Sequence, residues 1–284
     1  MQIEIKNVNY SYIKAKNKDN RVLKDISFNI EAGDFVAIVG ETGAGKSTLT
    51  QLFNGLIIPD SGEVKINNFL INNKTKTSKL FKLRKEVGIV FQFPEYQLFE
   101  DTILKDVMFG PKNFGMSDDL AKSSAIKALN QVGIQKELYE ISPFEISGGQ
   151  KRRVAIAGIL SSNPDIIVLD EPTVGLDPNG KKEIMNLISN LNKEGKTIIL
   201  VTHDMDAVMN FAKRVLVIKN GELVKNCEPK ILFNDKNIEE YSLNVPVLFK
   251  FKNLLRKYGF KKNIDELKNI DELIDVILER ENNE

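Results

Sequence analysis

The residues Phe35 to Ser47 read FVAIVGETGAGKS, an apolar run that leads into a glycine-rich loop. The run 35–39 has the length and composition of a strand buried on both faces of a parallel sheet, and residues 47–54 have those of a helix. The loop between them matches the pattern G-x-x-x-x-G-K-[ST] of a phosphate-binding loop. This order of strand, loop and helix predicts an α/β protein that binds a nucleotide at the end of a strand.

The chemistry of this loop follows from its glycines and from the helix that starts after it. Glycine has no Cβ, so the backbone can approach phosphates closely, and the free N–H groups at the helix start attract the β-phosphate. We expect Lys46 to reach the β- and γ-phosphates and the hydroxyl of Ser47 to bind Mg²⁺. A simple glycine-rich turn is the alternative, which the flanking strand and helix disfavour. The predicted nucleotide-binding residues are Gly40, Glu41, Thr42, Gly43, Ala44, Gly45, Lys46, Ser47 and Thr48.

Two more apolar runs end in polar residues of catalytic type. Residues 166–169 are followed by Asp170 and Glu171, and residues 197–202 by His203, the only histidine. The carboxyl ends of strands in an open α/β sheet form its ligand-binding edge. We therefore expect Asp170 to bind Mg²⁺ through water, Glu171 to act as general base toward the attacking water, and His203 to contact the γ-phosphate. A helix cap for the carboxylates and a surface or core position for the histidine are the structural alternatives.

A third motif, Ile146 to Gln150 (ISGGQ), lies between the loop and the acidic strand end. With these motifs in this order, residues 1–230 resemble the nucleotide-binding subunit of an ABC transporter. The resemblance implies an α/β P-loop ATPase with an N-terminal antiparallel part, a mostly parallel core sheet and an inserted helical subdomain. In that family the motif binds the γ-phosphate held by the other subunit, which implies a head-to-tail dimer with two shared ATP sites. The residues assigned to this contact are Ser147, Gly148, Gly149 and Gln150. Isoleucine at 146, where leucine is usual, changes only packing.

The resemblance also assigns three residues outside these motifs. Gln92 matches the glutamine that contacts Mg²⁺ and the attacking water and links the site to a transmembrane partner. Asp177, which ends the segment 175–177, faces the partner subunit. Tyr12 matches the aromatic residue that stacks on adenine. Neighbouring Tyr10 is the less favoured candidate, and a cross-strand aromatic contact is the structural alternative.

The residues after Gln92 narrow the resemblance further. Residues 93–102 and 106–111 are similar to those of the ATPases of energy-coupling factor (ECF) transporters, which import vitamins and cobalt or nickel ions. In that group the region adjoins the groove for coupling helices of a transmembrane scaffold protein. The candidate docking residues are Phe93, Pro94, Tyr96 and Phe99; packing of these aromatics between core and helical subdomain is the alternative. The alternative functions are an ABC importer or exporter of another type and a soluble ABC protein of translation or DNA repair.

Composition limits the partners. The 284 residues include 40 basic and 39 acidic side chains, a net charge of +1, and 42% are hydrophobic. This content suffices for a core, and the charge gives no overall field that favours nucleic acid. The single cysteine, Cys227, excludes an internal disulfide and suits a reducing cytosol. Neither a signal peptide nor a membrane-spanning run is apparent. We expect a peripheral protein at the cytoplasmic face of the membrane, with a second ABC ATPase, a transmembrane scaffold protein and a substrate-binding membrane protein as partners.

The sequence divides into an ATPase domain, 1–230, and a helical extension, 231–284. The first 30 residues are expected to form antiparallel strands, and a helical part is inserted at about 92–158. A hairpin near the end of the domain is predicted to turn at Asn220-Gly221.

The extension carries apolar residues at helical spacing in 247–258 and again in 270–278. The resemblance to ECF ATPases favours a contribution of this extension to dimerisation.

Overall fold

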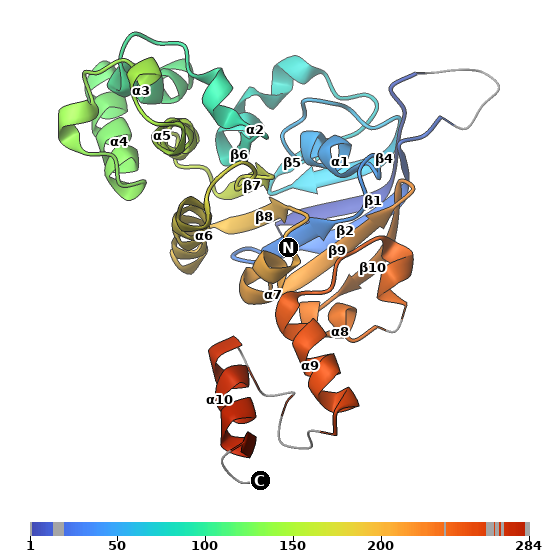
Figure 1. Ribbon diagram of the computed structural model, residues 1–284. Coiled ribbons are helices and arrows are strands. Elements are labelled where there is room, and N and C mark those ends of the chain that lie inside the picture. Colours follow the sequence, from blue (N-terminus) through green and yellow to red (C-terminus); the bar gives the residue numbers. More distant parts are fainter. Residues whose placement is uncertain are drawn as a thin grey trace.

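The computed structural model describes residues 2–13, 20–235, 237–259, 264, 267 and 270–281. Within these residues the chain forms two β-sheets with helices around them (Figure 1). Residues 14–19, which lie between the first two strands in sequence, are outside the described residues.

The first sheet is antiparallel and has the strand order β2-β1-β4-β5. Its strands are β1 (Ile3–Tyr10), β2 (Leu23–Ile30), β4 (Ser61–Ile66) and β5 (Phe69–Ile71). In β1, Ile3 lies opposite both Ile30 and Ile66, and all three side chains are fully buried. One face of this sheet therefore rests on the core. The antiparallel N-terminal part predicted from the sequence is confirmed.

The second sheet is mostly parallel and has the order β10-β9-β3-β8-β7-β6. Its strands are β3 (Phe35–Val39), β6 (Val87–Val90), β7 (Ile166–Asp170), β8 (Thr197–Val201), β9 (Arg214–Lys219) and β10 (Glu222–Cys227). Strand β10 runs antiparallel to β9, because the two form a hairpin that turns at Asn220 and Gly221, with φ of 52° and 82°. Every residue of β3, β6, β7 and β8 is buried, as expected for strands covered on both faces.

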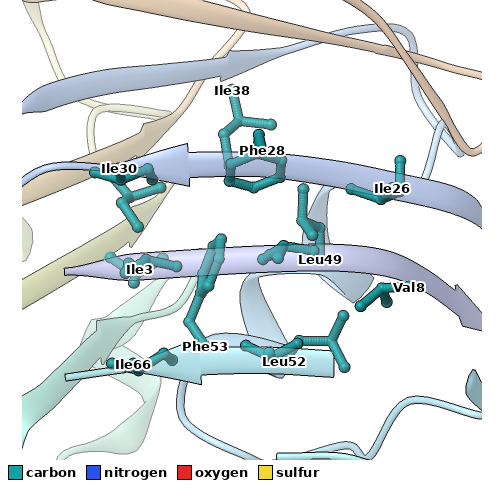
Figure 2. Close-up of a cluster of buried hydrophobic side chains, with 14 of the residues drawn as sticks. Ile3, Val8, Ile26, Phe28, Ile30, Ile38, Leu49, Leu52, Phe53 and Ile66 are labelled. Atoms are coloured by element: carbon teal, nitrogen blue, oxygen red, sulfur yellow. The ribbon is translucent and has the colours of Figure 1, made fainter. Parts of the chain in front are cut away.

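Helix α1 (Lys46–Phe53) packs between the two sheets. Figure 2 shows Leu49, Leu52 and Phe53 of this helix against isoleucines of β1, β2 and β4, with Ile38 of β3 in the same cluster. The side chains of Ile38, Leu49, Leu52 and Phe53 are all fully buried. The core therefore holds the start of α1 in place relative to the end of β3, where the glycine-rich loop joins them.

Four of the described helices lie on the side of the second sheet opposite α1 (Figure 1). They are α3 (Ile103–Asn113), α4 (Asp118–Gln131), α5 (Gly148–Leu160) and α6 (Pro178–Lys193). Of these, α5 and α6 lie against the strands and the others farther out. Shorter elements connect them or precede them: η1 (Thr77–Leu80), α2 (Phe81–Glu86), η2 (Pro94–Gln97), η3 (Lys136–Leu138) and η4 (Pro143–Glu145). The helical elements predicted between 92 and 158 are thus present, and α5 lies next to the sheet with α3 and α4 packed on it.

The C-terminal elements are α7 (Met205–Phe211), α8 (Pro229–Phe233), η5 (Ile238–Tyr241), α9 (Val247–Lys257) and α10 (Ile270–Glu281). Phe249 of α9 packs with α7 and α8 over β3 and β9. On another side of α9, Leu255 packs against Leu273 of α10. The apolar positions of this helix are therefore divided between two buried clusters and the surface, where Phe251 and Leu254 are exposed. No described helix has the length and hydropathy required to cross a bilayer.

Candidate functional site

A cleft of about 610 Å³ opens at the carboxyl edge of the second sheet. It brings together residues of the glycine-rich loop, of the ends of β7 and β8, of the segment after β6 and of the N-terminal region. Its lining comprises Tyr12, Val22, Thr42, Gly43, Gly45, Lys46, Ser47, Thr48, Gln92, Asp170, Glu171, Val174 and His203. Most residues predicted to bind the nucleotide, the metal or the attacking water thus meet in one place.

The glycine-rich loop depends on glycine at two positions. At Gly40, φ is 150° and a Cβ would lie 2.0 Å from the carbonyl oxygen of Ile218; at Gly45, φ is 103° and a Cβ would lie 2.8 Å from that of Val22. A side chain at either position would displace the backbone. Close packing of the loop against β9 and the residue before β2 therefore fixes its course.

Lys46 lies inside the loop, where its Nζ donates to the carbonyl oxygens of Gly40 and Glu41 at 2.8 and 2.9 Å. Burial lowers the pKa of this lysine, and the carboxylates of Glu171 and Asp170 oppose the shift. A half-buried ammonium group held by carbonyl oxygens can exchange them for phosphate oxygens at little desolvation cost. The arrangement favours an anionic ligand in the cleft.

Asp170 and Ser47 form a pair of oxygen ligands beside Lys46. Asp170 is buried; its burial raises its pKa, while a hydrogen bond with Ser47 and the charge of Lys46 act against the rise. Carboxylate and hydroxyl oxygens, completed by water and phosphate, suit Mg²⁺. Among the described residues there is no group of three or more His, Cys, Asp or Glu side chains that could hold a metal without such a ligand.

Glu171 directly follows β7 and has a left-handed backbone, with φ of 51°. Its N–H donates to the carbonyl oxygen of Val201, and its Oε1 lies 2.9 Å from Nδ1 of His203. Its Oε2 also accepts a longer hydrogen bond, 3.4 Å, from the hydroxyl of Thr202, for which the sequence predicts only a place in the strand. A non-glycine residue in this region costs about 1–3 kcal/mol and is frequent at functional sites.

The N-terminal aromatic residues occupy different environments. Tyr12 lines the cleft, is 57% exposed, and its hydroxyl lies 3.0 Å from that of Thr48. Tyr10 is half-buried against the core and meets the Tyr12 ring edge to face, with centroids 5.1 Å apart. Of the two, Tyr12 is the one with a ring face available to a ligand in the cleft.

The ISGGQ segment lies away from this cleft. Ser147 caps α5: its Oγ accepts from the N–H of Gln150, whose Oε1 in turn accepts from the N–H of Ser147. Ser147 and Gly148 are exposed at this helix start. Asp177 caps α6 through the N–H of Gly180, and it too is exposed and outside the cleft lining.

Sequence comparison relates the chain to a known family. A family model described as "ABC transporter" matches residues 23–174. The energy-coupling factor transporter ATP-binding protein EcfA2 of Ligilactobacillus salivarius (strain UCC118) is 49% identical over 281 residues, which cover 98% of this chain and 97% of that protein. The chain belongs to the energy-coupling factor branch of the ABC transporter family.

Solved structures agree with this membership of the ECF ATPases. The protein cbiO1 of Clostridium perfringens, part of the ABC transporter complex cbiONQ, is 38% identical and has a TM-score of 0.75 over 90% of this chain and 96% of that chain. A dimeric ATP-binding cassette in a post-hydrolysis state, bound to ADP and Pi, is 33% identical with a TM-score of 0.71 over 80% and 98% of the two chains. The predicted fold class and the resemblance to ECF ATPases are confirmed. The chain is an ATPase subunit of an ECF-type importer.

Proposed function

We propose that this ECF ATPase binds and hydrolyses MgATP in the cleft at the sheet edge, with each predicted residue in its assigned role. The observation that carries the proposal is the convergence of Lys46, Gln92, Asp170, Glu171 and His203 on one cleft from separate segments of the chain. The phosphates lie along the glycine-rich loop from Gly40 to Thr48, and adenine stacks on Tyr12. The free N–H groups of the loop and of the first turn of α1 favour the binding of an anion at this place.

The residues of this chain divide the chemistry among them. Ser47 and Asp170 hold Mg²⁺, which neutralises charge on the phosphates when bound. Glu171 accepts a proton from the attacking water, Gln92 orients that water, and His203 contacts the γ-phosphate. The contact between His203 and Glu171 at 2.9 Å sets the direction of both side chains before the nucleotide arrives.

The cleft of one chain is incomplete without a second ATPase subunit, on this proposal. Helix α5 has 13 residues, begins at Gly148 after its cap Ser147, and starts outside the cleft of its own chain. A helix start attracts anions through its N–H groups, here those of Gly148 and Gly149, beside the side chains of Ser147 and Gln150. We infer that they bind the γ-phosphate in a partner's cleft, and that Asp177 faces that partner. Membership of a family with a dimeric solved relative supports this arrangement.

A substitution in the ISGGQ segment tests the trans arrangement. Gly148→Asp places a carboxylate at the helix start, where a Cβ meets no atom within 4 Å, so the fold tolerates it. We expect the isolated chain to bind ATP as wild type does, and ATP hydrolysis by the complete transporter to fall. Reduced ATP binding by the isolated chain would instead place the segment at its own cleft.

The membrane partners dock, on this proposal, at aromatic residues near Gln92. Tyr96 and Phe99 are 84% and 56% exposed, and Phe99 meets Phe109 edge to face at 4.9 Å. Pro94 is buried and Phe93 is half-buried beneath Arg152, so these two pack internally. Tyr96 and Phe99 therefore fit the docking alternative, and Phe93 and Pro94 fit the packing alternative. The partner is a transmembrane scaffold protein, and a separate membrane protein selects the substrate, a vitamin or a transition-metal ion.

The experiment that tests the whole proposal is an affinity pull-down of the full-length chain from detergent-solubilised native membranes, with mass spectrometry of the proteins that co-purify. A second ABC ATPase, a scaffold protein and small substrate-binding membrane proteins are expected, at the cytoplasmic face of the membrane. A conventional permease with a solute-binding protein would contradict the ECF role, and ribosomes without membrane proteins would contradict the transport role.

The C-terminal extension, 231–284, contributes on this proposal to contact between the two ATPases. Large apolar side chains are exposed on α9, at the residue directly after it and on α10; they are Val247, Phe251, Leu254, Tyr258, Ile274 and Leu278. Leu254→Glu should weaken the dimer in analytical ultracentrifugation, whereas Glu239→Gln, a change at an exposed residue of η5, should not. Equal dimer stability in both variants would argue against this role.

A further inference from the structure

Arg152 is a buried arginine of α5 with partners in two other segments. Its side chain is 3% exposed. The guanidinium Nε and Nη2 donate to the two carboxylate oxygens of Glu95 at 3.0 and 2.6 Å. Its Nη1 donates to the carbonyl oxygens of Pro172 and Val174 at 3.2 and 2.5 Å. A single planar group therefore connects α5, η2 and the segment that follows β7.

The two segments that Arg152 joins follow directly on catalytic candidates. Glu95 lies three positions after Gln92, and Pro172 is the residue after Glu171. In each segment the backbone becomes left-handed: φ is 55° at Phe93 and 51° at Glu171. The guanidinium also lies over the Phe93 ring, 5.8 Å from its centroid. Arg152 thus holds both irregular backbone turns from one point.

The physical character of this contact makes it rigid. A guanidinium presents its donors in a fixed plane, so the bidentate bond to Glu95 sets the direction of Nη1 toward the two carbonyl oxygens. Burial raises the pKa of Glu95, but the hydrogen bonds from Arg152 and from its own N–H, with the arginine charge, bring the pKa below its usual value. The pair therefore stays ionised near neutral pH. A lysine could not serve all these acceptors at once, because it offers a single point charge.

We propose that Arg152 is a positioning residue that fixes Gln92 and Glu171 relative to each other and transmits displacement of η2 to Glu171. The inference rests on the proposed roles of Gln92 and Glu171 and on docking beside η2. Because Glu95 is in the same short turn as exposed Tyr96, a partner that moves this turn pulls on the guanidinium. The guanidinium is hydrogen-bonded to the carbonyl oxygens of Pro172 and Val174, so its displacement moves the segment that follows Glu171.

The neighbouring arginine provides a matched control. Arg153, on the same helix as Arg152, pairs with Glu183 of α6 at 2.5 Å, and within the described residues it makes no hydrogen bond to η2 or to the segment after Glu171. Glu183→Gln removes that ion pair, as Glu95→Gln removes the pair with Arg152. Any general effect of losing a charge pair on α5 appears in both variants.

The test compares Arg152→Lys, Glu95→Gln, the double variant and Glu183→Gln in the complete transporter. The measured quantities are kcat per ATP-binding site, KM for ATP, and ATP affinity of the folded chain by calorimetry. We expect kcat to fall at least about tenfold in Arg152→Lys and less in Glu95→Gln, with KM and affinity changed by less than about twofold. The double variant should match Arg152→Lys alone, since both changes break one linkage.

Three outcomes would overturn the proposal. They are kcat within about twofold of wild type in Arg152→Lys, an equal loss in Glu183→Gln, and independent, multiplying effects in the double variant. Glu171→Gln, measured alongside, separates this inference from the proposed function. If that variant is inactive while Arg152→Lys is fully active, the catalytic site stands and only the positioning role fails.

Discussion

Nδ1 of His203 lies 2.9 Å from Oε1 of Glu171, so the only histidine of the chain contacts the carboxylate that directly follows β7. The two residues come from adjacent parallel strands, β7 and β8, whose ends meet at the ligand-binding edge of the sheet. The histidine side chain is 75% exposed and the glutamate side chain 14% exposed. The carboxylate is thus sheltered within the cleft, while most of the imidazole is exposed at its opening.

Glu171→Gln should retain ATP binding and lose turnover. Glutamine keeps the shape of the side chain but cannot accept the proton of the attacking water, so kcat should fall by about 10²- to 10⁴-fold. The variant should also accumulate as an ATP-bound closed dimer, visible by size-exclusion chromatography with light scattering. Normal turnover would show that another group is the base.

Lys46→Ala should weaken nucleotide binding. The ammonium group is held at the loop by two carbonyl oxygens and lines the cleft. Hydrogen bonds to charged groups contribute about 1.5–3 kcal/mol. We expect ATP affinity in calorimetry to fall at least about tenfold. Lys65→Ala removes a charge from an exposed position of β4 and serves as the control. Unchanged binding by Lys46→Ala would exclude the phosphate-binding role.

Asp170→Asn should separate stability from metal binding. Burial raises the pKa of Asp170, so the folded chain holds this proton more tightly than the unfolded chain. Ionisation therefore destabilises the nucleotide-free fold: the penalty develops as pH rises above the unfolded pKa and is complete above the raised, folded pKa. The amide variant should melt at an equal or higher temperature than wild type near neutral pH, yet need more Mg²⁺ for ATP hydrolysis. A lower melting temperature with an unchanged Mg²⁺ requirement would contradict both parts.

Tyr12→Ala should weaken ATP binding through loss of stacking. Stacking of a base on an aromatic side chain contributes about 1–3 kcal/mol, which corresponds to a roughly 5- to 140-fold change in affinity. Tyr12→Phe keeps the ring and loses only the hydroxyl contact to Thr48, so its affinity should remain near wild type. If wild type, Tyr12→Ala and Tyr12→Phe bind ATP equally well and Tyr10→Ala binds it more weakly, adenine stacks on Tyr10 instead.

Leu52→Ala should lower the stability of the cassette. Leu52 is fully buried between the two sheets (Figure 2), and truncation of such a leucine costs about 2–5 kcal/mol. Leu56→Ala, at a residue 45% exposed, should change the free energy of unfolding by no more than about 0.5 kcal/mol. Urea unfolding followed by circular dichroism measures both. Similar values for the two variants would mean that α1 is not part of the common core.

Local patterns predicted the elements that carry the site. The strand Phe35–Val39 has the predicted bounds, and α1 starts one residue earlier than expected, at Lys46. Ser147 is the cap of α5, as serine before a helix indicates. These features were accessible because a buried strand, a glycine-rich loop and a helix cap are each specified by a few neighbouring residues.

The linkage through Arg152 could not be read from the sequence. Its carboxylate partner, Glu95, is 57 positions away, and its carbonyl partners are 20 and 22 positions away. An arginine within a charged run gives no signal that it will be buried, and backbone carbonyls carry no residue type. The left-handed φ of Glu171 was equally hidden, because glutamate rarely adopts it without tertiary contacts.

The sequence by itself determined which chemical groups this protein has and on which strand ends and helix starts they stand, because short-range hydrophobic patterns and backbone preferences are local. Tertiary structure decided which of these groups meet. Tyr12 rather than Tyr10 lines the cleft, and Ser147 lies away from the cleft of its own chain. The apolar positions of α9 are divided between two buried clusters and the surface. These outcomes depend on packing between sheets and helices that are far apart in the chain, and no short sequence pattern specifies such contacts.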